Sequence, residues 1–158
     1  MRNLVLVRID DRLIHGQVVT AWIKHTHGNR ILIIDDKLVN DRIMQRVLKA
    51  AAPPGIVVEV LTVENSTTLL KEDSGPDERI IILVKTPDIL ERLLDGGVEI
   101  KKIVIGGMGI TPQRKRYNKS LSASDDEVAC MKRMMQKGVV MTFQLVPETG
   151  AVNGDKLF

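Results

Sequence analysis

The sequence predicts an α/β fold: one open, mostly parallel sheet of six strands with helices on both faces. Short runs rich in β-branched residues alternate with segments of helical period along the chain. Most of these runs are apolar at every position, as strands covered on both faces are. With 158 residues, 44% of them apolar, the chain suits a single domain, which we place at 1–158.

Six segments have the character of strands, and only the last of them alternates apolar with polar residues. That alternation predicts an edge strand with one solvated face. After it, Asn153 and Gly154 form a turn signal, so the C-terminal segment could add a short extra strand or hairpin. The six segments are 4–9, 31–34, 56–61, 80–84, 103–105 and 139–146.

Helices are predicted between the strands, because apolar pairs recur there every four residues and would form one buried stripe on each helix. Their boundaries carry capping signals: Thr86 before Pro87, and Ser124 three residues before Glu127. Another helix is expected between 63 and 72. The apolar stripes are Val18, Val19, Trp22 and Ile23; Ile43, Met44, Val47 and Leu48; and Ile89, Leu90, Leu93 and Leu94.

Composition excludes several classes of protein. The longest wholly apolar run, 80–84, has five residues, whereas a membrane-spanning helix needs about 20. The N-terminus shows no secretory signal, so we expect a cytoplasmic protein. Cys130 is the single cysteine and cannot form an internal disulfide or a zinc site by itself. The net charge is only +3 and aromatic content is 3%, which argues against nucleic-acid binding.

Ligands bind at the carboxyl ends of strands in such a fold, and the first of these loops is rich in chemistry. Residues 8–17 bring two cations, two carboxylates and a histidine to the start of a helix. His15 would lie among unpaired backbone N–H groups, where the helix dipole favours anions. Arg12 could clamp an anion there, and Asp10 or Asp11 could hold one ring nitrogen and present the other. This pattern suits a histidine that accepts a phosphoryl group.

The same residues also suit a simpler interpretation. The charged side chains could form a loop ion-pair network, with His15 as an ordinary helix-terminal residue. The residues alone leave both interpretations open. Neighbouring loops pose similar choices: Gly106 and Gly107 could be a tight turn or a wall beside His15, and Asp36 a helix-entry turn or the site rim. The basic run Arg114, Lys115 and Arg116 could be a solvated loop or a docking rim for an acidic partner.

The segment 7–18, Val-Arg-Ile-Asp-Asp-Arg-Leu-Ile-His-Gly-Gln-Val, resembles the active-site segment of a known family. These are the IIB components of the mannose/fructose/sorbose family of the bacterial sugar phosphotransferase system. Further motifs resemble the family in the same order along nearly the whole chain. They are Ile34-Asp35-Asp36, Lys49-Ala50-Ala51-Ala52-Pro53, Val84-Lys85-Thr86-Pro87, Gly106-Gly107-Met108 and Gln144-Leu145-Val146-Pro147.

The resemblance implies a phosphocarrier enzyme, a protein-phosphohistidine–sugar phosphotransferase. A separate IIA partner would phosphorylate Nδ1 of His15, which would pass the group to sugar entering through membrane IIC/IID components. Arg12 would stabilise the phosphoryl oxygens and Asp10 would orient the ring. No metal, cofactor or nucleic acid is implied. The binding residues would be Arg8, Asp11, Gly16, Gln17, Asp36, Gly106 and Gly107.

Two other functions remain open from the sequence. One is a nucleotide- or nucleic-acid-binding module that uses the glycine loop and the basic run. The other is a regulatory protein in which phosphorylated His15 is only a signal. The sequence does not separate mannose, fructose, sorbose, N-acetylgalactosamine or related amino sugars as the transported sugar, and it leaves a homodimer open.

Overall fold

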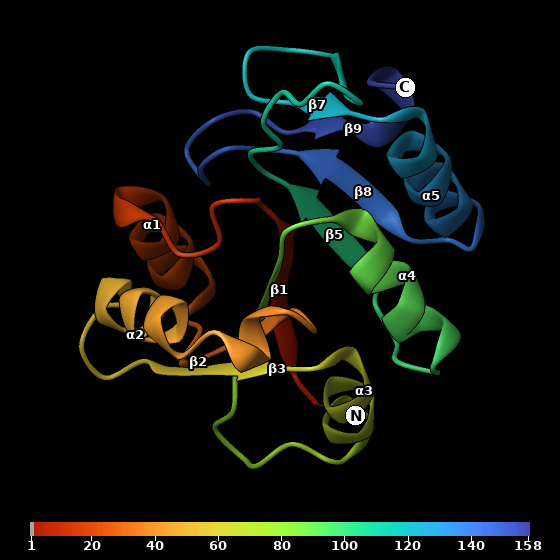
Figure 1. The fold of residues 1–158 in the computed structure, drawn as a ribbon. Coiled ribbons are helices and arrows are strands. Elements are labelled where there is room, and N and C mark those ends of the chain that lie inside the picture. The colour runs from red at the N-terminus through yellow and green to blue at the C-terminus, as the bar shows by residue number, and fades with distance from the viewer. Residues whose placement is uncertain (1) are drawn as a thin grey trace.

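The computed structural model, which describes residues 2–158, shows one sheet with the strand order β3-β2-β4-β1-β5-β8-β9 (Figure 1). The pairs are parallel except for the last, in which β9 runs antiparallel to β8. The strands are β1 (Leu4–Ile9), β2 (Arg30–Ile34), β3 (Val57–Leu61), β4 (Ile80–Val84), β5 (Lys102–Ile105), β8 (Val140–Phe143) and β9 (Val152–Asn153). The predicted parallel α/β sheet is confirmed, and so is the extra C-terminal strand.

Helices cover both faces of the sheet (Figure 1). On one face, α1 (Gly16–Thr26) and α2 (Arg42–Ala51) pack with β1, β2 and β4 around one apolar cluster. On the other, α3 (Val63–Lys71), α4 (Pro87–Asp95) and α5 (Asp125–Gln136) pack around a larger cluster. Two short 3-10 helices, η1 (Leu38–Asn40) and η2 (Gly154–Lys156), complete the fold. Within residues 2–158, no helix is long and apolar enough to cross a membrane.

The predicted capping box of α5 is present. Ser124 accepts a hydrogen bond from the Glu127 N–H, and the Glu127 carboxylate accepts one from the Ser124 N–H. This exchange satisfies two backbone donors that would otherwise be unpaired at the helix start. α4 begins with Pro87 after Thr86, as predicted, although the Thr86 side chain makes no capping hydrogen bond.

The last predicted strand, 139–146, is wrong in two respects. β8 ends at Phe143, because the chain turns there and the next two backbone carbonyls point to Arg8 instead of a neighbouring strand. Nor is β8 the edge, since β9 pairs along its outer side. The long loop that follows β5 also contains a small hairpin that the sequence did not predict, β6 (Lys115–Arg116) with β7 (Ser122–Ala123).

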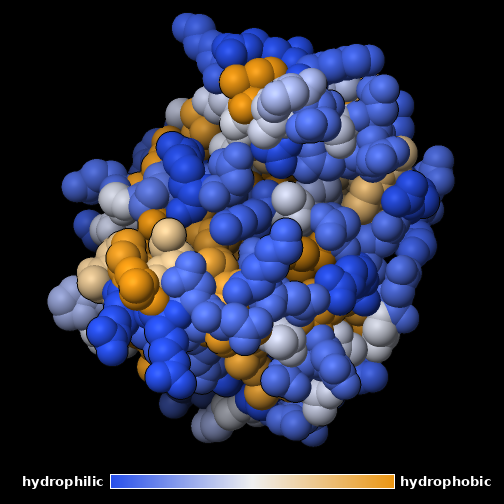
Figure 2. Space-filling model, in the orientation of Figure 1, coloured by the Kyte–Doolittle hydropathy of each residue, from blue (hydrophilic) through white to orange (hydrophobic). Residues whose placement is uncertain are grey.

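The apolar stripe predicted for α2 is largely exposed. Leu48 is buried, but Ile43 is 77% exposed and Val47 56% exposed. Ile43 and Val47 lie on one line along the helix, and Met44 and Leu48 lie on an adjacent line about 100° away around its axis. The line through Leu48 faces the core, and the line through Ile43 and Val47 faces solvent. Figure 2 shows the resulting hydrophobic patch over α2.

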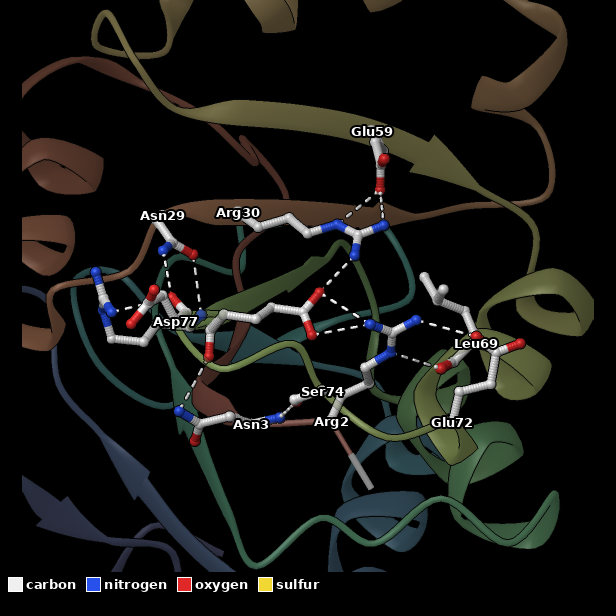
Figure 3. A network of polar contacts seen from close by, with 11 residues as sticks. Arg2, Asn3, Asn29, Arg30, Glu59, Leu69, Glu72, Ser74 and Asp77 are labelled. Carbon is white, nitrogen blue, oxygen red and sulfur yellow. Dashed lines mark hydrogen bonds and ion pairs between the residues drawn. The ribbon is translucent and has the colours of Figure 1, made fainter.

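An ion-pair network joins the starts of β1 and β2 to the loop before β4 (Figure 3). Arg2 and Arg30 both bind the Glu78 carboxylate, and Arg30 also binds Glu59 on β3. A second carboxylate, that of Glu72, binds Arg2. Charge-assisted contacts of this kind fix the ends of three strands relative to one another.

Candidate active site

The loop between β1 and α1 is organised around Asp10, the first residue after β1. Its side chain is fully buried, and its two oxygens accept hydrogen bonds from three backbone or side-chain groups of the same loop. Oδ1 accepts from the Arg12 N–H at 3.0 Å and from Arg12 Nε at 3.2 Å, and Oδ2 lies 3.0 Å from His15 Nε2. The Gly107 N–H adds a bond of 3.2 Å to Oδ2. Asp10 therefore gathers the loop around one carboxylate.

The charge of Asp10 is maintained by these donors. Burial by itself would raise the pKa of Asp10, but the hydrogen bonds from Arg12, His15 and Gly107 outweigh it and lower the pKa. A carboxylate that stays ionised in the interior is a strong acceptor for an imidazole N–H.

His15 caps the N-terminus of α1. Its backbone is extended, with φ −146°, and its side chain makes no capping bond, so the ring is free to turn to Asp10. Because the carboxylate accepts at Nε2, the proton of the neutral ring lies on Nε2 and the lone pair is on Nδ1. The side chain is 21% exposed. His15 thus combines a fixed tautomer with access from solvent.

Arg12 reaches the same site from the loop, but its side chain is 52% exposed. Its Nε and one Nη bind Asp10 at 3.2 and 3.4 Å, which leaves other guanidinium N–H groups free to bind an anion. Together with the N-terminus of α1, it makes the space beside His15 electropositive.

Two glycines at the end of β5 allow the arginines to approach. A Cβ at Gly106 would lie 2.2 Å from Arg8 Nη2, and a Cβ at Gly107 would lie 2.9 Å from Arg12 Nη2. A side chain at Gly106 would displace a buried guanidinium. The glycine pair is therefore more than a tight turn: it forms the wall against which both arginines lie.

Comparison with known proteins identifies the family of the chain. The profile of the PTS system sorbose subfamily IIB component matches residues 4–158. The chain belongs to this family. The IIB chain is 33% identical to the sorbose-specific EIIB component of Klebsiella pneumoniae over 151 residues, 96% of this chain and 92% of that protein.

Two further comparisons extend this finding. The IIB chain is 33% identical to the mannose-specific EIIAB component of Escherichia coli strain K12 over 141 residues. That match covers 89% of this chain but only 44% of the EIIAB protein. The crystal structure of manxB from Thermoanaerobacter tengcongensis is 38% identical and superposes with a TM-score of 0.91, covering 98% of this chain and 94% of that one.

Asp11 and Asp10 have different partners, which resolves a choice that the sequence left open. Asp11 accepts from the Gly109 N–H at 2.8 Å and from Arg114 at 3.3 Å, whereas Asp10 binds His15. Asp11 thus ties the β1–α1 loop to the loop after β5.

The predicted basic rim is reduced to two residues. The Arg114 side chain is 9% exposed and pairs with Glu127 at 2.8 Å as well as with Asp11. This pairing with Glu127 raises the pKa of Arg114. Arg114 is therefore a link between elements and not a free surface charge. Lys115 and Arg116 remain exposed on β6.

Three other predicted binding residues have different surroundings. Asp36 accepts from the Val63 N–H at 2.9 Å and pairs with Arg92, so its contacts are with the start of α3 and with α4, not with the His15 group. Gln17 is exposed in the first turn of α1. Gly16 has a φ of +47°, and a Cβ there would meet nothing within 4 Å. The backbone conformation, and not access to the ring, is what favours glycine at this position.

Sequence reasoning missed three contributors to the site. The backbone carbonyls of Gln144 and Leu145 accept from Arg8 at 2.8 and 3.0 Å, and the Trp22 ring lies against the same guanidinium. Trp22 was assigned only to an apolar stripe. The one available signal was Arg8 itself, a charge inside an otherwise apolar strand, which requires buried partners. Among residues 2–158, no group of three His, Cys, Asp or Glu side chains could hold a metal ion.

Proposed function

We propose that this IIB chain is a phosphocarrier that accepts a phosphoryl group on Nδ1 of His15 from a phosphohistidine of a IIA partner. It then passes the group to sugar that enters through membrane IIC/IID components. The observation that carries the proposal is the contact between His15 Nε2 and the buried Asp10 carboxylate, since it presents Nδ1 as the nucleophile. Membership of the IIB family supports the same role.

The first transfer exchanges one phosphorus–nitrogen bond for another. The Nδ1 lone pair of His15 attacks phosphorus while the bond from phosphorus to the donor ring breaks, and that electron pair returns to the donor nitrogen. In the second transfer, a sugar hydroxyl oxygen attacks phosphorus and releases its proton to water, while the phosphorus–Nδ1 bond breaks and its electron pair returns to Nδ1. The Nε2–H of His15 stays hydrogen-bonded to Asp10 in both transfers.

The surroundings of His15 supply what a loose phosphoryl-transfer transition state needs, which is alignment and stabilisation of charge on the oxygens. Alignment comes from Asp10, which fixes the ring plane. Positive potential comes from the exposed part of Arg12 and from the first N–H groups of α1. No covalent help beyond the histidine is required.

The partners and location follow from the same role. The curated EIIAB relative carries a mannose-specific function in one longer chain, and we propose that a separate IIA protein supplies the phosphoryl group here. We place the IIB chain in the cytoplasm, in contact with the permease at the membrane surface. Sorbose and mannose, named for the relatives, are the first sugars to test.

The relay is tested with phosphoenolpyruvate, the general phosphotransferase proteins, a matched IIA and membranes that contain the IIC/IID components. Wild-type IIB should restore phosphorylation of one of these sugars, and His15→Ala should abolish it. His27→Asn serves as the matched control, because His27 is exposed at the other end of α1 and Asn tolerates its left-handed backbone, and it should behave as wild type. If His15 is labelled but none of sorbose, mannose, fructose, N-acetylgalactosamine or related amino sugars accepts the group, the protein is a regulatory phosphoprotein and not a carrier.

A further inference from the structure

Trp22 is buried on α1 and makes two polar contacts that ordinary core packing does not require. Its indole Nε1–H donates to the Leu145 carbonyl at 2.9 Å. Its ring faces the Arg8 guanidinium, whose Cζ lies 5.2 Å from the ring centroid, within the range of a cation–π interaction. Only 4% of Trp22 is exposed, so both contacts are shielded from water.

Arg8 connects this tryptophan to the site. Its side chain is 2% exposed, and burial lowers the pKa of Arg8 while the neighbouring Asp10 opposes that shift. Nη2 donates to the same Leu145 carbonyl at 3.0 Å and reaches Asp10 Oδ2 at 3.4 Å. That oxygen is the one that binds His15 Nε2. An unbroken series of contacts therefore runs from Trp22 to the His15 ring.

The guanidinium of Arg8 is held by a ring, a glycine and two backbone carbonyls. The Trp22 ring lies against it, and the backbone of Gly106 lies so close that a Cβ there would clash with it. Two carbonyls accept hydrogen bonds from its Nη groups. A guanidinium held in this way can approach Asp10 in only one manner, which limits how the carboxylate can rotate.

We propose that Trp22 is a positioning residue for phosphoryl transfer, acting through Arg8 and Asp10 on the orientation and tautomer of His15. The inference rests on the proposed function, in which His15 is the acceptor. Trp22 does not contact the reacting atoms. It fixes the cation that partly balances the Asp10 charge, and Asp10 in turn fixes the ring.

The charged groups that face this series come from a few elements. Arg8 of β1 and Arg12 of the β1–α1 loop both face Asp10. From the end of β5, the Gly107 N–H, an uncharged donor, binds Asp10, and the segment after β8 supplies two carbonyls to Arg8. On α1, the His25 ring packs edge-on against Trp22 at 5.9 Å. Displacement of Arg8 would remove one of the contacts that fix the Asp10 carboxylate, and the carboxylate could then rotate away from the His15 ring.

The test compares Trp22→Phe, which loses the N–H donor, with Trp22→Leu, which also loses the aromatic face. The control is Val19→Ala, which removes packing from the same buried face of α1 but has neither an N–H donor nor an aromatic face to lose. All are studied at a temperature where each remains folded. One measurement is the single-turnover transfer rate from phospho-IIA across a pH series. The other is the ¹⁵N spectrum of the His15 ring, which reports the tautomer without any partner.

A small misplacement of a reacting group can cost up to about 100-fold in rate, so we expect Trp22→Phe to slow transfer by about tenfold and Trp22→Leu by more. The pH profile of the rate should differ from that of wild type, and the ring should lose its preference for the Nε2–H tautomer. Val19→Ala should leave the tautomer and the pH profile unchanged. Ring spectra and pH profiles of both Trp22 variants that match Val19→Ala would overturn the inference.

Failure of the proposed function gives a different result. In that case wild-type protein takes no phosphoryl group on His15, whatever residue stands at position 22. The ring spectra still decide the inference, because they measure the coupling of Trp22 to His15 directly.

Discussion

At the scale of single residues, the site depends on how one buried carboxylate distributes its oxygens. Asp10 Oδ2 receives His15, while Oδ1 receives Arg12 through its backbone N–H and its Nε. The backbone N–H of Arg12 shapes the loop, and its exposed guanidinium still has N–H groups that can bind an anion.

Substitution of Arg12 separates charge from geometry. Arg12→Lys keeps the charge but loses the planar set of donors, so transfer from phospho-IIA should slow, and Arg12→Ala should slow it further. Loss of one donor to developing charge in a preorganised site costs about 100-fold in rate. Single-turnover rates measure the effect. Rates for both variants within a factor of two of wild type would show that Arg12 is structural.

Sequence reasoning named His15, both site arginines and the two glycines, which the structure brings together, because these residue types are close together in the chain or follow a strand end. It could not choose between Asp10 and Asp11, because adjacent loop residues point in different directions that only the folded backbone defines. Trp22 escaped notice for another reason. Its spacing fits a buried stripe, and nothing local shows that its N–H meets the carbonyl of a residue 123 positions away.

At the scale of elements, the local sequence pattern located all six predicted strands, and capping residues located the start of α5. It failed for the orientation of α2, where two adjacent apolar lines compete for the core and the line through Leu48 prevails. It also failed for β8, whose C-terminal residues leave the sheet to supply carbonyls to Arg8. In both cases tertiary contacts decide what the local pattern leaves open.

The β6–β7 hairpin carries the surviving part of the predicted docking rim, Lys115 and Arg116. Rim charges act mainly on the rate of encounter. Lys115→Gln with Arg116→Gln should therefore lower the rate of association with IIA and flatten its dependence on salt, with little change in dissociation. Thermal stability should hold, because the Lys115–Asp125 pair is highly exposed, at 71% and 80%.

The matched control for this prediction removes the same charge elsewhere. Lys101→Gln with Lys102→Gln neutralises two exposed lysines at the start of β5, at the end of the strand opposite the site. Stopped-flow association across a salt series compares the two double variants. Equal salt slopes for both would mean that net charge, and not the hairpin, steers the partner.

At the scale of the whole molecule, the two ends of the sheet do different work. The candidate site lies at the carboxyl ends of β1 and β5. At the opposite end of the sheet, the Arg2–Glu78–Arg30 network ties the starts of β1 and β2 together (Figure 3). Burial would raise the pKa of Glu78, but hydrogen bonds from Arg2 and Arg30 outweigh it and lower the pKa. The ionised Glu78 carboxylate therefore stabilises the folded state relative to the unfolded state.

This lowered pKa predicts how stability depends on pH. The contribution is fully present above the ordinary glutamate value of 4.5 and is lost as the pH falls through the lower pKa of the folded state. Glu78→Gln should reduce the free energy of unfolding at pH 7 by about 1–3 kcal/mol. Urea unfolding of both proteins between pH 7 and pH 3 measures this. A difference that does not narrow in acid would contradict the assignment.

The central claim is that Asp10 holds Nε2 of His15 and so leaves Nδ1 as the acceptor. The most direct measurement is ³¹P and ¹⁵N NMR of the ¹⁵N-labelled protein after phosphorylation by phospho-IIA. The account predicts a single phosphorus–nitrogen bond per chain, at Nδ1 of His15, with Nε2 still carrying its proton. Phosphorus on Nε2 of His15, or on either ring nitrogen of His25 or His27, would contradict it.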